Sequence, residues 1–202
     1  MPQALYYKGV AAKQQKKSIS MIMHTNKEGG LVHEDIQAHE PSAAKLSGSF
    51  DYESLDDALL HRKGSFHYKS KDGNYKQWGE TRTCRLISKP EMEKHVSTLQ
   101  SLTSGNAEVI ELAKELKVPS GEDAVYFECL GHNSKEDYMS FFSFDQKNLI
   151  KGSYFPGSVP RARTAVNAEV SSSFRADGRA AGTWHVPKKS SSFHADDYRC
   201  SF

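Results

Sequence analysis

The sequence is short of the residues that usually fill a protein core. Leu, Ile, Val and Phe together account for 39 of its 202 residues, about 19%, which is just under the level below which disorder becomes plausible. Disorder also requires a high net charge, whereas 27 Lys and Arg oppose 25 Asp and Glu here, for a net charge of +2. Nine Tyr, two Trp and five Met add apolar bulk. We therefore expect a folded chain whose core depends on aromatic side chains.

Several functional classes lack their sequence signatures. No apolar run reaches the ~18 to 20 residues of a membrane-spanning helix, and the first charges follow the short apolar start instead of preceding it, unlike a secretory signal. Gly-rich phosphate loops, the G-x-S-x-G elbow and H-E-x-x-H are absent. The near-zero net charge argues against a non-specific nucleic-acid binder. We expect a cytoplasmic protein without a membrane or nucleic-acid partner, and the sequence indicates neither a cofactor nor an oligomeric state.

The sequence has three cysteines without C-x-x-C spacing: Cys84, Cys129 and Cys200. Neither a zinc knuckle nor a disulfide framework is implied, so reduced cysteines are expected. Cys84 lies close to Arg82 and Arg85, which could lower the pKa of its thiol, and His132 follows Cys129 by three residues. Cys84 and Cys129 are therefore candidate nucleophiles, although a free Cys in a strand is more commonly a small buried apolar residue.

The hydrophobic pattern predicts an α+β fold. Alternating segments predict a mostly antiparallel sheet of about seven to nine strands, strongly twisted or partly closed. A short early helix is expected over 51–60, because Tyr52, Leu55 and Leu59 follow the i, i+3, i+7 spacing. Two central helices are expected between Ser88 and Pro119, and all three helices would cover one face of the sheet. Residues 1–186 would form a single domain, followed by a Ser- and charge-rich, mobile tail over 187–202.

The most metal-like cluster is His33, Asp35 and His39, which strand alternation places on one face. Two His and one carboxylate form a ligand set for iron or zinc, but His33 and His39 would lie about 20 Å apart on one straight strand. They cannot hold the same ion directly. A working site would need Asp35 with one of them and a further ligand from elsewhere, and the alternative is a polar, solvent-facing strand.

Other candidate site residues are single side chains whose neighbours in the sequence could assist ligand binding. His67 and His185 each lie next to aromatic residues, on which a planar ligand could stack, and are candidate catalytic imidazoles. Arg82 and Arg85 are candidates for holding an anion. His95, on the edge of an apolar helix face, is more commonly a packed residue than a general base.

Two functions from different classes remain open. The first is a soluble, non-catalytic binding module that presents a curved, aromatic-lined sheet surface to a protein or a small ligand. The second is a small hydrolase- or transferase-type enzyme, such as a toxin or effector, with a histidine-centred site. The lack of catalytic motifs favours the first, and the nine histidines motivate the second.

Overall fold

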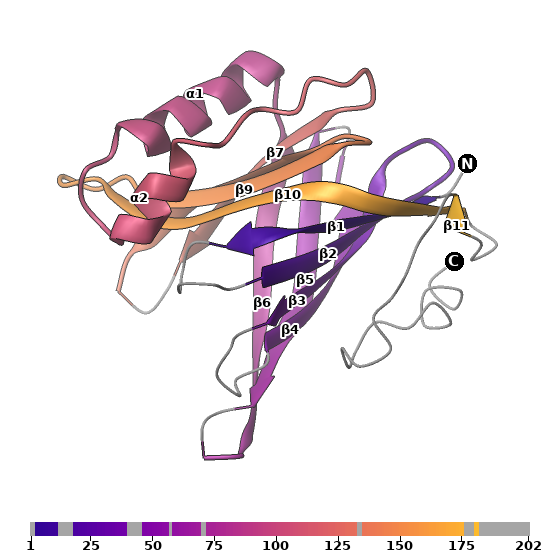
Figure 1. Cartoon of the computed structure of the whole chain (residues 1–202), viewed down its shortest axis with the longest axis horizontal. Coiled ribbons are helices and arrows are strands. Elements are labelled where there is room, and N and C mark those ends of the chain that lie inside the picture. The colour runs from indigo at the N-terminus through magenta and orange to yellow at the C-terminus, as the bar shows by residue number, and fades with distance from the viewer. Residues whose placement is uncertain are drawn as a thin grey trace.

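The chain folds into a closed antiparallel β-barrel, described by a computed structural model over residues 3–11, 18–39, 46–56, 58–69, 72–132, 135–175 and 180–181. Ten strands pair with their neighbours in chain order, and the first also pairs with the tenth (Figure 1). The strands are β1 (Gln3–Ala11), β2 (Ser18–Thr25), β3 (Leu31–His39), β4 (Leu46–Ser54), β5 (Leu59–Lys69), β6 (Tyr75–Leu86), β7 (Val125–His132), β8 (Asp137–Phe144), β9 (Asn148–Phe155) and β10 (Arg161–Arg175). The two-residue β11 (Ala180–Ala181) pairs with β10.

Strand β1 closes the barrel, because it pairs with β2 on one side and with β10 on the other. The backbones of β1 and β10 approach most closely at Gly9, where a Cβ atom would lie 2.0 Å from the carbonyl oxygen of Asn167. A glycine is therefore needed at this position. The register between β1 and β10 also shifts between Tyr6 and Tyr7, and such bulges bend a strand as closure requires.

The barrel interior holds an apolar core that is rich in aromatic side chains. Because successive residues of a strand face opposite sides, alternate positions of every strand meet inside. The rings of Phe127 and Phe142 stack there with their centroids 4.8 Å apart. The core also contains Tyr7, Met21, Met23, Phe50, Tyr52, Phe144 and Leu149, all buried. A closed barrel with a buried aromatic cluster is compatible with a binding module.

Two helices, α1 (Lys89–Ser101) and α2 (Ala107–Ala113), lie outside the barrel against the sheet of β7 to β10 (Figure 1). The sequence between Ser88 and Glu91 forms the capping box that starts α1, with each side chain accepting a hydrogen bond from the other residue's backbone N–H. A second core fills the space between helices and strands. It contains Met92, Val96, Leu99, Val109, Ala113, Phe141, Ile150 and Tyr154.

The expected α+β sheet of seven to nine strands with three helices is wrong, since ten strands close into a barrel and the described residues contain two α-helices. The segment over 51–60, expected to be the early helix, instead comprises the end of β4, a turn and the start of β5. Asp56 accepts hydrogen bonds from the backbone N–H groups of Ala58 and Leu59, both at 2.8 Å, and Leu55 is 55% exposed. Asp56 therefore stabilises a turn, and two of the three apolar residues at helical spacing, Tyr52 and Leu59, lie in strands.

Two predictions concern residues that lie outside the described ranges, namely His185 and the tail over 187–202.

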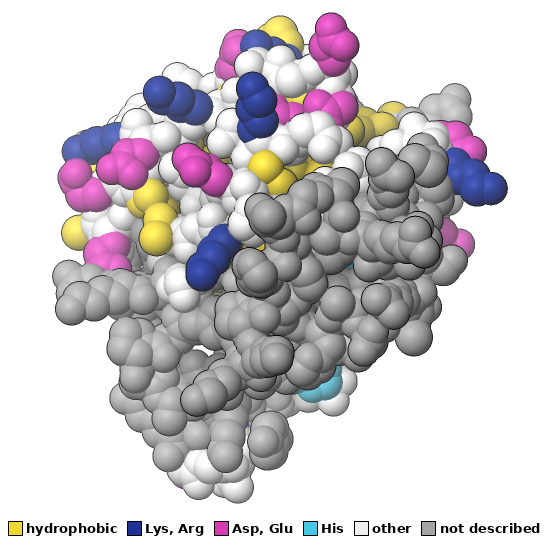
Figure 2. Space-filling model, turned by 45° about the vertical axis from the view of Figure 1, so that its right-hand side comes forward, with side chains coloured by type: hydrophobic (Ala, Val, Ile, Leu, Met, Phe, Trp, Pro, Cys, Tyr) yellow, Lys and Arg dark blue, Asp and Glu magenta, His cyan; other side chains and the backbone are white. Residues whose placement is uncertain are grey.

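No helix in the described ranges is long and apolar enough to cross a membrane. On the face shown in Figure 2, the described Lys and Arg side chains are interspersed with Asp and Glu.

Candidate functional site

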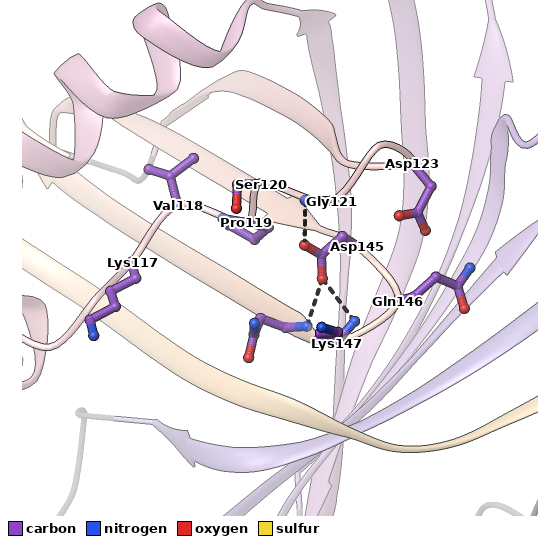
Figure 3. Close-up of a pocket in the computed structure, with 10 residues that line it drawn as sticks. Lys117, Val118, Pro119, Ser120, Gly121, Asp123, Asp145, Gln146 and Lys147 are labelled. Carbon is purple, nitrogen blue, oxygen red and sulfur yellow. Dashed lines mark hydrogen bonds between the residues drawn. The ribbon is translucent and has the colours of Figure 1, made fainter.

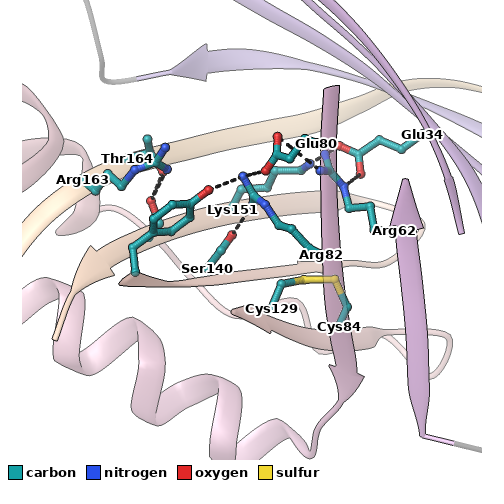
Figure 4. A network of polar contacts seen from close by, with 12 residues as sticks. Glu34, Arg62, Glu80, Arg82, Cys84, Cys129, Ser140, Lys151, Arg163 and Thr164 are labelled. Atoms are coloured by element: carbon teal, nitrogen blue, oxygen red, sulfur yellow. Dashed lines mark hydrogen bonds and ion pairs between the residues drawn. A yellow bond between two sulfur atoms is a disulfide. The ribbon is translucent and has the colours of Figure 1, made fainter. Parts of the chain in front are cut away.

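Six charged side chains lie inside the barrel beside its aromatic core (Figure 4). They occupy inward-facing positions of β3, β5, β6, β9 and β10, and two are carboxylates whereas four are cations. The six residues are Glu34, Glu80, Arg62, Arg82, Lys151 and Arg163. Together with the neutral Tyr52, Tyr138, Ser140 and Ser153, which hydrogen-bond to them, they form what we call the interior network.

Glu34 is the most deeply buried charge of the interior network. Its carboxylate pairs with the ammonium group of Lys151 and accepts a 2.6 Å hydrogen bond from the Tyr52 hydroxyl, which in turn accepts one from Arg62 Nε at 3.0 Å. Burial alone would raise the pKa of Glu34, but the charges of Lys151 and Arg62 outweigh it and lower the pKa to about 2. This carboxylate is therefore ionised at neutral pH.

Arg62 and Arg82 share the second carboxylate, Glu80. Arg82 pairs directly with it, whereas Arg62 Nη1 lies 3.8 Å from it, beyond hydrogen-bond distance. The remaining contacts of Arg82 are with neutral oxygens, the Tyr138 hydroxyl at 2.6 Å and Ser140 Oγ at 3.4 Å. Burial, and then repulsion by Arg62, lowers the pKa of Arg82 to about 10.

Arg163 has no acidic partner among the residues that the structure describes. Its guanidinium lies 3.9 Å from the ring centre of Tyr138, and Nη1 donates a hydrogen bond to Ser153 Oγ at 3.2 Å. Arg163 is the third residue of β10 and is only partly buried. It therefore lies at the end of the network nearest the β9–β10 turn.

The interior network carries a surplus of two positive charges, from four cations and two carboxylates. Buried charge without a counter-charge is costly. In addition, Arg62 Nη1 and Arg82 Nε are buried and have no hydrogen-bond partner. Both the charge and the unpaired donors would be satisfied by an anion, since guanidinium groups form strong hydrogen bonds with carboxylate and phosphate.

A second polar group, which we call the outer cluster, lies on the outward faces of β2, β3 and β4 and comprises His24, His33, Asp35 and Asp51. Asp35 lies between the histidines, 3.2 Å from His24 Nε2 and 3.1 Å from His33 Nε2. Asp51 contacts the other ring nitrogen of His33 at 2.7 Å. Burial opposes protonation of His33, but hydrogen bonds and charges of Asp35 and Asp51 outweigh it and raise the pKa of His33 to about 9.

A third polar group joins α1 to the sheet. His95 Nδ1 lies 2.9 Å from the Tyr154 hydroxyl, and Nε2 lies 2.6 Å from the Glu128 carboxylate, which also pairs with Arg85. His95, Glu128 and Tyr154 line a depression of about 330 Å³ beside α1. Burial, and then the charge of Glu128, raises the pKa of Tyr154, so its phenol remains protonated at neutral pH.

Comparison with known proteins assigns no family to this chain. Searches against family models, curated proteins and solved structures found no match. Function must therefore be argued from the geometry of these groups.

The two candidate nucleophiles, Cys84 and Cys129, form a disulfide between β6 and β7 (Figure 4). The expectation of reduced cysteines is therefore not met, and neither sulfur is a thiolate while the bond is intact. The residues lie directly opposite each other in the β6–β7 pair. Their separation of 45 residues along the chain hides this pairing from any local sequence pattern.

The other predicted site residues are distributed over the barrel. Arg82 faces inward and belongs to the interior network, whereas Arg85 faces outward and pairs with Glu128. His67 is exposed on β5 and lies 3.1 Å from Ser65 Oγ. The structure does not bring these residues together into one site.

Of the predicted metal ligands, the structure brings His33 and Asp35 together and adds His24 from the neighbouring strand. His39 is the last residue of β3, and its side chain lies outside the described part of the chain.

Sequence reasoning missed most of the interior network. A usable signal exists: Glu34 occupies the same strand face as Ile36 and Ala38, which are buried, so a charge interrupts an apolar series.

A further depression, of about 480 Å³, lies at the opposite end of the barrel from Arg163, between residues 117–123 and the β8–β9 turn (Figure 3). The Asp145 carboxylate accepts hydrogen bonds from the backbone N–H groups of Gly121, Lys147 and Asn148 at 3.0, 2.8 and 2.8 Å. Those bonds tie two loops together. We assign Asp145 a structural role.

Proposed function

We propose that the barrel binds a small organic anion whose charged group lies against Arg62, Arg82 and Arg163 of the interior network. The observation that carries this proposal is the surplus of two positive charges inside the barrel, on side chains that include buried donors without hydrogen-bond partners. An interior location suits a small molecule better than a protein partner, because it lies behind the strands.

The surroundings of the cations indicate what the rest of the ligand would be. Eight-stranded barrels are just wide enough to be filled by side chains or to hold one small ligand, and the diameter grows with strand number. A ten-stranded barrel therefore encloses a wider interior than an eight-stranded one. The Arg62 guanidinium lies 3.4 Å above the ring centre of Phe50, and Lys151 lies 5.3 Å from that of Phe142. A ligand with an apolar or aromatic body next to its carboxylate or phosphate would match both surfaces.

Calorimetric titration with organic carboxylates, each compared with its neutral amide, tests this function. We expect saturable binding of one or more carboxylates and none of the matched amides. Arg163→Gln should weaken binding by roughly 10- to 100-fold, since a charge-assisted hydrogen bond contributes about 1.5–3 kcal/mol. The control is Arg85→Gln, which removes an outward-facing arginine and should leave affinity unchanged. Equal binding of acid and amide, or equal losses in both variants, would contradict the proposal.

The alternative function, a histidine-centred enzyme, is supported by the alignment of Tyr154, His95 and Glu128 along an open depression. The raised pKa of Tyr154 makes its hydroxyl a weak nucleophile, which favours a structural role. Turnover of activated esters by the wild-type protein, lost in His95→Gln with the fold retained, would favour the enzyme instead.

A further inference from the structure

We infer that His24, His33 and Asp35 form a binding site for a divalent transition-metal ion of the zinc type on the outer face of the barrel. The site belongs to the outer cluster and does not depend on the proposed function, because these side chains face away from the interior network. The sequence analysis required a third ligand from another segment in addition to His33 and Asp35, and His24 on β2 supplies it.

The three potential ligand atoms lie close enough to share one ion. One ring nitrogen of each histidine and one oxygen of Asp35 all lie within 4.8 Å of one another. His24 Nε2 lies 3.2 Å from Asp35 Oδ2, and His33 Nε2 lies 3.1 Å from the other carboxylate oxygen, Oδ1. Ligands bound at about 2.1 Å to a tetrahedral ion are roughly 3.4 Å apart. Each histidine already has this spacing to one oxygen of the Asp35 carboxylate, so modest side-chain movements would place both nitrogens and the carboxylate around one ion.

The strand framework explains how the ligands come to share one place. His24 and His33 are directly opposite each other in the β2–β3 pair, and their ring centroids are 5.2 Å apart. Asp35 follows His33 by two residues and so projects from the same face. Ligands on paired strands are held more rigidly than ligands on loops, which reduces the entropy lost on binding an ion.

Asp51 supplies the support that metal-binding histidines usually have. A ligating histidine commonly donates its second ring N–H to a carboxylate, which fixes the tautomer and the ring orientation. Asp51 on β4 lies 2.7 Å from His33 Nδ1, which leaves Nε2, 3.1 Å from both Asp35 Oδ1 and Ser49 Oγ, as the ligating nitrogen. Asp51 would therefore act as a positioning residue.

The donor set and its exposure define the type of ion. Two imidazoles and one carboxylate suit zinc, iron, nickel or copper, whereas magnesium and calcium prefer oxygen ligands alone. His24 is 1% exposed, but Asp35 is 14% and His33 21% exposed at their side chains. An ion can therefore approach from the His33 side, and a water molecule can occupy its fourth position.

Titration of the full chain with Zn²⁺, together with the visible absorption spectrum of added Co²⁺, tests this site. We expect one Zn²⁺ per chain, a Co²⁺ spectrum typical of nitrogen and oxygen ligands, and no binding of Mg²⁺. His33→Gln and Asp35→Asn should each abolish saturable binding, and Asp51→Asn should weaken it by roughly 10- to 100-fold. His67→Gln, which removes an exposed histidine from β5, is the matched control and should change nothing.

Three results would overturn the inference. They are absence of saturable Zn²⁺ binding to the wild-type protein, unchanged binding in both His33→Gln and Asp35→Asn, and loss of binding in His67→Gln. His33 and Asp35 are partly exposed, so these variants should keep the fold, which circular dichroism would verify. Carboxylate titrations of the same variants separate this inference from the proposed function, because anion binding should persist when zinc binding is lost.

Discussion

The barrel core and the core beneath the helices share strands β7 to β10 but differ in what they contain. The helix-covered core is built from apolar side chains such as Leu99, Phe141 and Ile150. The barrel core continues into a network of six charged side chains, of which Arg163 lacks an acidic partner within the described residues. Proteins tend to accept such locally unfavourable arrangements at functional sites. One face of the sheet is thus covered by a purely apolar core, whereas the other also carries the charges on which the proposed anion site depends.

The largest effect should follow from opening the covalent link inside the barrel. The Cys84–Cys129 disulfide closes a segment of 45 residues that contains both helices. Its replacement by two serines should reduce the free energy of unfolding by about 4 kcal/mol if chain entropy dominates, as measured by urea denaturation. Cys200→Ser preserves this disulfide and is the control. An equal loss in the control, or none in the double variant, would show that the link does not stabilise the barrel.

A cavity in the helix-covered core should affect stability alone. Leu99 is fully buried between α1 and the sheet, so Leu99→Ala should cost about 2–5 kcal/mol. The control is Leu130→Ala, since Leu130 is 67% exposed and its truncation should cost little. Anion affinity of the folded fraction should stay unchanged in both variants. If Leu99→Ala weakened anion binding as strongly as Arg163→Gln, the two cores could not be assigned different roles.

The smallest effect is a pH dependence that acts on binding and stability in opposite directions. Burial lowers the pKa of Lys151 to about 8, against the attraction of Glu34. As the pH rises through 8, Lys151 loses its charge, so the affinity for a carboxylate should fall by at most tenfold per pH unit. The unfolded chain keeps this proton up to a pKa near 10.5, so the unfolded state binds more protons and the stability of the free protein rises over the same interval.

Lys151→Arg provides the control for that titration, because a guanidinium keeps its charge throughout. Calorimetric affinities measured from pH 7 to 9, below the pKa of Arg82, should fall in the wild-type protein and remain level in this variant. A decline of the same size in both proteins would assign the pH dependence to another group.

Local sequence patterns identified the elements whose partners are near in the chain. The two central helices expected between Ser88 and Pro119 are confirmed as α1 and α2. Barrel closure was not predictable, because β1 pairs with β10 more than 150 residues later. No turn signal or hydrophobic periodicity in the sequence near residues 3–11 predicts that β1 pairs with β10.

The same limit applies to the candidate site. His33 and Asp35 could be grouped from the sequence because they lie two residues apart on one strand. His24, opposite His33, required knowledge of the register. The inward charges Arg62 and Lys151 are unremarkable in sequence, since only closure of the sheet distinguishes the inside from the outside of a strand.

Three successive residues of β3 contribute to polar groups on both sides of the barrel wall. His33 and Asp35 face the outer cluster, and Glu34 between them faces Lys151 in the interior. A shift of the strand by one residue would exchange the two faces, directing imidazole inward and the buried carboxylate into solvent. A substitution on β3 therefore alters either the interior network or the outer cluster, whereas an insertion or deletion that shifted the register of β3 would alter both together.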